Sequence, residues 1–277
     1  MNRESITRLI QCIVVPFIGM FAAGRLSGWL LAGLGMADWV TEFGSFLLAA
    51  LTAAFLYRCL DPTRWGDVFR ETAAEPCSVP LAAAHVGYSL LWLMAAMYVV
   101  LAVFPAEGEE SSRSLAGALF SAVLVHPMLE EWLFRRVLLS RLLALTKGDE
   151  PVCEIVSGED KTGRKSRKQY TRAGKLFAVL TQAVLFALMH TGGGSMLYGF
   201  AGGIILGVLM LRTGRLWVPV VSHMLINLRS VLWPLLPGNV TLAADIVLIA
   251  VGLFCGLCFW IATIRRTRME KKQEAEL

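Results

Sequence analysis

The stretch SAVLVHPMLEEWLFRRVLLSRLLAL, residues 121–145, places two adjacent glutamates, Glu130 and Glu131, inside a strongly apolar run, and Arg135 and Arg136 follow directly. A charged side chain at the centre of a membrane helix costs roughly 2.5–3.5 kcal/mol on insertion scales. Ionisable residues inside membrane segments are therefore rare, and they mark functional sites by default. The stretch predicts a buried reactive site in a membrane protein.

The chain as a whole has the composition of a membrane protein. Of its 277 residues, 56% are hydrophobic and only 17% are charged, whereas soluble domains are less apolar and more charged. The apolar residues form long blocks, as bilayer spans require. The sequence predicts an all-α, polytopic bundle of transmembrane helices. Its net charge of +5 indicates contact with anionic lipid headgroups, not with nucleic acid.

Eight apolar segments are candidate membrane spans. Lysine and arginine gather after the second, fourth, sixth and eighth segments, and acidic residues gather after the first and third. Because positive charge marks the cytoplasmic side, both termini are expected in the cytoplasm and the protein in the cell (inner) membrane. The predicted spans are 9–35, 43–60, 81–104, 115–142, 175–190, 195–211, 216–233 and 241–264.

The chain is expected to fold as one membrane-embedded domain, residues 1–277. The segment between the fourth and fifth spans is basic, polar and poor in apolar periodicity, which is typical of a mobile loop. The domain divides into accessory N-terminal spans (1–114), a motif core (115–233) with a mobile cytoplasmic loop (147–172), a last span (241–264) and a polar tail that frays (265–277).

Two backbone features of the core segment carry structural predictions. Gly199, Gly203 and Gly207 are spaced four apart, so one helix face is bare backbone that another helix can approach closely. Pro127 predicts a kink or a new helix start just before Glu130. A new helix N-terminus at that point would favour the ionised form of Glu130.

Three pairs of residues lie four apart in different spans, so the members of each pair share a helix face. Each histidine alone has an ordinary structural explanation, as a residue at a helix end or as a hydrogen-bonding partner of a neighbouring helix. His85 and His126 are interpreted in that way, as satisfied or interfacial side chains. The three pairs are Glu131 with Arg135, Phe186 with His190, and His223 with Asn227.

Taken together, the polar residues of the spans have a chemical logic. A carboxylate beside a histidine can hold and deprotonate a water molecule. A second histidine and an amide on a facing helix can donate hydrogen bonds to an oxygen that gains negative charge. This set predicts hydrolysis of an amide bond without a covalent intermediate.

Three motifs resemble one known family. EEWLFR (130–135), FALMH (186–190) and HMLIN (223–227) match the EExxxR, FxxxH and HxxxN motifs, in the same order, of the CPBP family. These are intramembrane endopeptidases, also called the Abi or type II CAAX prenyl endopeptidase family. The resemblance covers about residues 115–230 and implies a membrane protease of the helical class.

The resemblance also implies roles for individual residues. Its mechanism depends on a glutamate without a metal cofactor, and zinc bound by the glutamate and both histidines is the alternative. The substrate would be a peptide or protein, with or without a lipid modification, reached from the cytoplasm or the lipid. The roles would be water activation by Glu130 with His190, oxyanion stabilisation by His223 and Asn227, support by the Glu131–Arg135 pair, and lining of the site by Phe134 and Phe186; the zinc ligands would be Glu130, His190 and His223.

Two other functions fit parts of the sequence. A non-catalytic assembly or immunity protein of the same fold would bind a peptide without cleaving it. A transporter would be expected to carry internal repeats and charges spread over several spans. The sequence has no evident internal repeat, and its polar intramembrane residues gather in three spans, so the protease interpretation leads.

Overall fold

The computed structural model describes residues 7, 10–60, 77–104, 115–146, 171–190 and 192–275. Within these ranges the backbone is helical and contains no strand, which confirms the all-α prediction. The predicted mobile loop, 147–172, lies outside the described residues except at its last two positions.

Every predicted apolar segment falls on helical backbone. The fourth segment is a continuous helical run in which short α-helices alternate with π-helical turns. The elements are η1 (Ile10–Val14), α2 (Val15–Gly33), α3 (Asp38–Leu60), α5 (Val79–Val103), α6 (Leu115–Ala118), η2 (Leu119–Val125), α7 (His126–Glu131), η3 (Trp132–Leu138), α8 (Leu139–Leu145), α9 (Arg172–Ala187), α10 (Gly193–Thr213), α11 (Trp217–Leu232), η4 (Trp233–Leu235) and α12 (Gly238–Ala275).

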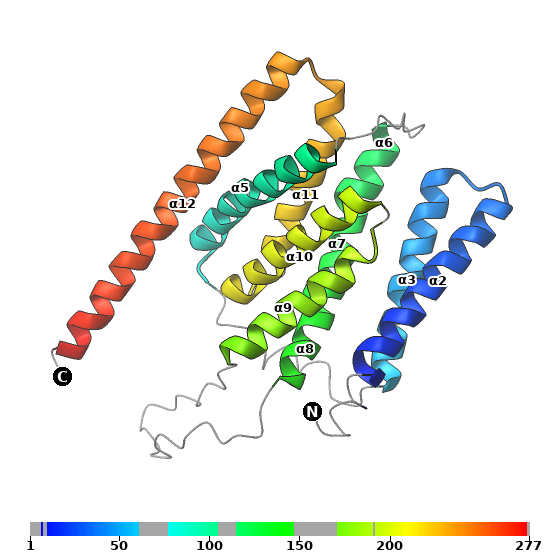
Figure 1. The fold of residues 1–277 in the computed structure, drawn as a ribbon, viewed down its shortest axis with the longest axis horizontal. Helices are drawn as coiled ribbons and strands as arrows, with labels where there is room; N and C mark the ends of the chain where they lie inside the picture. Colours follow the sequence, from blue (N-terminus) through cyan, green and yellow to red (C-terminus); the bar gives the residue numbers. More distant parts are fainter. Residues whose placement is uncertain are drawn as a thin grey trace.

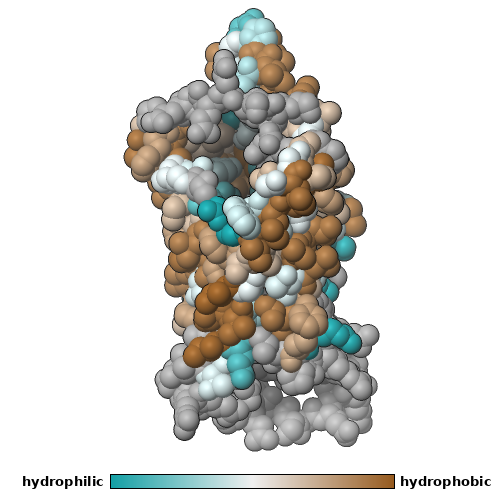
Figure 2. All heavy atoms as spheres, turned by 90° about the vertical axis from the view of Figure 1, so that its right-hand side faces the viewer, coloured by the Kyte–Doolittle hydropathy of each residue, from teal (hydrophilic) through white to brown (hydrophobic). Residues whose placement is uncertain are grey.

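Four helical segments are long and apolar enough to cross a membrane: Val15–Gly33, Val79–Val103, Gly193–Thr213 and Gly238–Ile261. A shorter apolar segment, Phe43–Leu56, lies within α3. Figure 2 shows hydrophobic side chains over the middle of the face on the α2–α3 side, as a lipid-facing surface requires. Helix length and composition thus give four candidate spans among the described residues, and the count of eight stays a prediction.

The helices form a bundle in which the motif-bearing segments are central. The α2–α3 pair lies at one side and α12 lies at the other, packed on α5 (Figure 1). Helix α10 packs between α9 and α5, and α11 contacts α5, η2 and α7. One apolar core joins the α2–α3 pair to η3, α8 and α9. A second core joins α5, α10 and α11.

Helix α12 continues through Ala275, so most of the predicted polar tail, 265–277, is helical, and its fraying stays a prediction. The segment after Ile261 reads ATIRRTRMEKKQEA. Arginine, lysine, glutamate, glutamine, methionine and alanine are all good helix formers, and no glycine or proline interrupts them. The span therefore extends into a polar helix instead of ending in a coil.

The helical run does not restart at Pro127. Residues on both sides are helical, and the π-helical turn η2 ends at Val125, immediately before α7. A wider turn accommodates a residue that lacks an N–H donor and clashes with the preceding carbonyls. The predicted new N-terminus near Glu130 is therefore absent, and the helix dipole does not stabilise that carboxylate.

A buried polar network that was not predicted ties α12 to the bundle. Arg229 on α11 donates to both carboxylate oxygens of Asp245 on α12, from Nε at 2.8 Å and from Nη2 at 2.7 Å. Tyr98 of α5 bonds to both partners, and Trp233 Nε1 donates to Asp245 at 2.9 Å. A bidentate, hydrogen-bonded pair is how a buried charge is tolerated. Asp245 was missed because its neighbours in sequence are uniformly apolar.

The glycine ladder of α10 packs against α9, as predicted from its spacing. A Cβ atom at Gly203 would lie 2.8 Å from the Ala183 Cα, and one at Gly207 would lie 2.6 Å from Gln182 Nε2. Gln182 is fully buried and donates to the Gly203 carbonyl at 2.7 Å. The bare face therefore brings α9, and the motif at its end, close to α10.

Replacement of Gly203 by alanine is expected to destabilise the bundle by roughly 1–3 kcal/mol, the usual cost of overpacking. The added methyl group would meet backbone atoms of α9, which cannot move without separating the two helices. Gly202→Ala is the matched control, because a Cβ there would lie 3.8 Å from Leu93, an ordinary contact. Thermal unfolding in detergent should separate the two variants, and equal midpoints would contradict this account of the ladder.

Candidate active site

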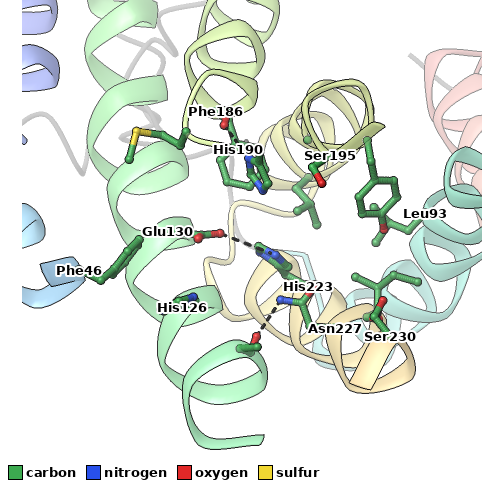
Figure 3. Close-up of a pocket in the computed structure, with 17 residues that line it drawn as sticks. Phe46, Leu93, His126, Glu130, Phe186, His190, Ser195, His223, Asn227 and Ser230 are labelled. Carbon is green, nitrogen blue, oxygen red and sulfur yellow. Dashed lines mark hydrogen bonds and ion pairs between the residues drawn. The ribbon is translucent and has the colours of Figure 1, made fainter. Parts of the chain in front are cut away.

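The three motif segments converge on one cavity of about 500 Å³. Its lining includes Glu130 from α7, His190 after α9, and His223 and Asn227 from α11 (Figure 3). Helices α3, α5 and α10 complete the walls. The four residues predicted to be catalytic therefore share one chamber, although they lie far apart in the sequence.

Glu130 presents a carboxylate to this cavity. Its side chain is 16% exposed, and Oε2 lies 3.8 Å from His223 Nε2. This separation is too long for a direct hydrogen bond. The carboxylate is therefore within water-bridging reach of the imidazole while it still faces the cavity.

Glu131 links the first motif to the third. Its side chain is fully buried; Oε1 accepts a hydrogen bond from His223 Nδ1 at 2.9 Å, and Oε2 forms an ion pair with Arg135 Nε at 3.0 Å. An ionised carboxylate can only accept, so Nδ1 of His223 carries a proton. The other ring nitrogen, Nε2, is then directed toward Glu130. The sequence predicted the ion pair with Arg135 but not the bond to His223.

Asn227 is held by the π-helical turn before α7. Its Nδ2 donates to the Ala122 carbonyl at 2.8 Å. In π-helical register that carbonyl would accept from the residue five positions later, which is Pro127 and has no N–H. The proline thus frees a carbonyl that fixes the Asn227 amide. One of the two amide N–H groups remains for another acceptor.

His190 lies in the turn that follows α9. Its Nδ1 is 3.0 Å from the Phe186 carbonyl, and because a carbonyl only accepts, Nδ1 carries the proton. Nε2 is then an acceptor in the neutral ring. The imidazole packs on bare backbone, since a Cβ at Gly199 would lie 2.9 Å from Nδ1. The first glycine of the ladder therefore makes room for a site residue.

The two predicted phenylalanines have different positions. Phe186 lines the cavity, whereas Phe134 is 1% exposed and is not part of the lining. The rings meet edge to face with centroids 5.0 Å apart, so Phe134 packs behind Phe186. The Arg135 guanidinium lies 4.4 Å from the Phe186 ring centroid, a favourable cation–π contact.

His126 is a cavity residue that the sequence interpretation assigned to a satisfied or interfacial role. It lies one turn before Glu130 on the same helix face, and its ring stacks on Phe46 of α3 with centroids 4.8 Å apart. The spacing of four from Glu130 was the available signal. It was missed because Phe46 lies in a span with no motif.

The predicted zinc ligands line one cavity but are not grouped around one point. The described residues, which include Glu130, His190 and His223, contain no group of three or more His, Cys, Asp or Glu side chains that could hold a metal ion. The bond from His223 Nδ1 to Glu131 leaves Nε2 directed to the cavity, and a carboxylate on the other ring nitrogen is common for metal-bound histidines. The zinc alternative therefore stays a prediction.

Known proteins resemble this chain over the motif region and beyond it. Residues 112–229 match the family model described as type II CAAX prenyl endopeptidase Rce1-like. The chain is 24% identical over 245 residues to the membrane-embedded CAAX protease MroQ of Staphylococcus aureus (strain USA300), a match that covers 84% of this chain and 89% of that protein.

A second relative is the Bacillus subtilis (strain 168) protein named "Putative membrane peptidase YdiL". It is 25% identical over 171 residues, which cover 55% of this chain and 59% of that protein. No solved structure gives a significant match. Residues 112–229, which match the family model, contain all three motifs and therefore all the cavity residues that belong to these motifs. The predicted resemblance is thereby confirmed: residues 112–229 match the Rce1-like family model, and the chain is similar to proteins named CAAX protease and putative membrane peptidase.

Proposed function

We propose that this protein is an intramembrane endopeptidase in which Glu130 activates the hydrolytic water. The observation that carries the proposal is the convergence of Glu130, His190, His223 and Asn227 on one cavity between helices. A general base, a water-orienting acceptor and two potential hydrogen-bond donors then surround one space.

The proposed mechanism uses an ionised Glu130 and a protonated His223. Two carboxylates, Glu130 and Glu131, face one guanidinium, Arg135, and one imidazole, His223. With both carboxylates ionised and His223 protonated, the group is electrically neutral. Neutrality matters here because an unbalanced charge in a low-dielectric interior is expensive. Protonated His223 also carries the Nε2–H that an oxyanion needs.

The reaction follows from these states. Glu130 takes a proton from water while the water oxygen bonds to the scissile carbonyl carbon, and His190 Nε2 accepts the second water hydrogen to orient it. The oxyanion receives hydrogen bonds from His223 Nε2–H and the Asn227 amide. The carbon–nitrogen bond then breaks, and the proton held by Glu130 passes to the leaving amine.

The substrate is a peptide or protein segment, with or without a lipid modification, that enters from the cytoplasmic side or from the lipid. The relatives named CAAX protease and membrane peptidase support the substrate class. We place the protein in the cell membrane with eight spans and both termini in the cytoplasm, on the charge asymmetry of its polar segments. Reporter fusions at both termini test this topology.

A peptidomic comparison tests the activity. Cells that produce the wild-type protein should release peptides that are missing when His190→Ala replaces it at equal abundance. Loss is expected because Nε2 of His190 no longer orients the water. Identical peptide sets, with both proteins folded and in the membrane, would overturn the proposed function and favour the non-catalytic assembly or immunity role.

The two proposed oxyanion donors, His223 and Asn227, can be tested separately. His223→Ala and Asn227→Ala should each reduce kcat by roughly 10²–10³-fold, the usual cost of one oxyanion donor. Ser230→Ala is the matched control: it lines the same cavity from the same helix, and its hydroxyl bonds the Ile226 carbonyl at 3.1 Å. Single-turnover rates with a cleaved peptide provide the measurement. A comparable loss in Ser230→Ala would argue against specific donors.

Metal dependence separates the proposed mechanism from its zinc alternative. No step above passes through a metal, so dialysis against a strong chelator should leave the cleavage rate unchanged. Loss of cleavage that returns on addition of zinc would instead support the zinc alternative on Glu130, His190 and His223.

A further inference from the structure

A second cavity, of about 270 Å³, lies between α5 and α10 and shares no lining residue with the first. Its polar lining comes from His85, Tyr88, Ser89 and Trp92 of α5 and from Arg212 in the last turn of α10. The rest of its wall is aliphatic and comes from Ile204, Ile205, Val208 and Leu209 of α10. Nothing in the proposed peptidase mechanism uses it.

The polarity of this cavity changes along its length. The start of α5 is tied to the end of α10, because Cys77 N donates to the Thr213 carbonyl at 3.1 Å and Arg215 Nε donates to the Cys77 carbonyl at 2.6 Å. Arg212 lies in the last turn of α10, and Ile204 lies about 12 Å back along the helix at 1.5 Å per residue. The α10 wall of the cavity is therefore cationic at one end and aliphatic at the other.

The Arg212 guanidinium has no acidic partner among the residues that line the cavity. Arg212 is within electrostatic range of His85, and no carboxylate lines the cavity. Arg212 forms no ion pair with any described residue, while the His85 ring is only 4% exposed and packs on Phe259 with ring centroids 4.6 Å apart. A cation beside an imidazole, without an acid, favours an anion between or above them.

We propose that this cavity binds one chain of an anionic phospholipid, with the phosphate at Arg212 and the chain along α10. Arginine at the end of a membrane-spanning helix lies at headgroup level. Tyr88 and Trp92 lie near the middle of α5, where the lipid chain would contact them. The volume of about 270 Å³ lies just below the usual range of ligand pockets, so the cavity has room for part of a single chain. The site is independent of the proposed peptidase activity.

Quenching of Trp92 by brominated lipid tests the proposal. The full-length protein is reconstituted into phosphatidylcholine vesicles that contain equal fractions of either brominated phosphatidylglycerol or brominated phosphatidylcholine. The fluorescence of Trp92 is obtained as the difference in emission between the wild type and Trp92→Phe. Brominated phosphatidylglycerol should quench the Trp92 fluorescence more strongly than brominated phosphatidylcholine. Arg212→Gln should weaken that preference about fivefold, the factor expected for one basic residue near an anionic surface.

Two control variants separate the effect of Arg212 from a general loss of positive charge. Arg25→Gln removes a cation from the exposed face of α2 and should keep the preference, as should Arg212→Lys, which retains the charge. Equal quenching by both lipids in the wild type would show that the cavity has no preference for anionic lipid, and it would overturn the proposal. Inorganic phosphate that abolishes the preference would identify a free-anion site and would also overturn it.

Discussion

Glu130→Gln is expected to reduce the rate of peptide cleavage by roughly 10²–10⁴-fold, the range that a positioned general base contributes. Glutamine has nearly the same shape but cannot accept a proton from water. The fold should be retained, because the Glu130 side chain faces the cavity and its nearest charged partner, His223, is 3.8 Å away. Single-turnover kinetics in detergent or vesicles measure the effect.

Glu130→Asp sharpens this test. It keeps the carboxylate but withdraws it by one methylene group, so its rate should fall between those of the wild type and Glu130→Gln. Small displacements of a catalytic group are costly when the reacting atoms must be aligned. A Glu130→Gln protein that unfolds at the wild-type temperature and cleaves at the wild-type rate would remove Glu130 from the mechanism.

Arg135→Met is expected to give the largest loss of stability, about 3–5 kcal/mol, the usual result of removing one partner of a buried ion pair. Arg135 and Glu131 are both fully buried, and their atoms lie 3.0 Å apart. Without the guanidinium, the Glu131 carboxylate would keep only its bond to His223. The loss should appear as a lower unfolding midpoint and as lower abundance in the membrane.

Two comparisons isolate the unpaired charge as the cause. The double variant Glu131→Gln, Arg135→Met should be more stable than Arg135→Met alone, because it leaves no buried charge without a partner. Arg136→Met changes the adjacent arginine, which is only partly buried, and should cost less. If the double variant were the less stable one, packing of the arginine side chain, not charge, would be the cause.

The sequence predicted most of the helices because apolar blocks of span length leave few alternatives in a bilayer. Every predicted segment is helical, and the glycine ladder packs as its spacing indicated. The sequence did not predict polar residues whose partners lie on another helix. Asp245 lies in an apolar segment, and its hydrogen bond from Arg229 of α11 explains its presence there.

The sequence by itself predicted which residues would meet: three motifs in order, in apolar segments, with Glu130, His190, His223 and Asn227 at fixed positions. The tertiary structure added how they are oriented. The bond from His223 to Glu131 directs Nε2 to Glu130, the carbonyl freed by Pro127 holds Asn227, and His126 joins the lining. Periodicity specifies a helix face, since it repeats along one chain segment, whereas a hydrogen bond between helices depends on packing angle and depth that no single segment encodes.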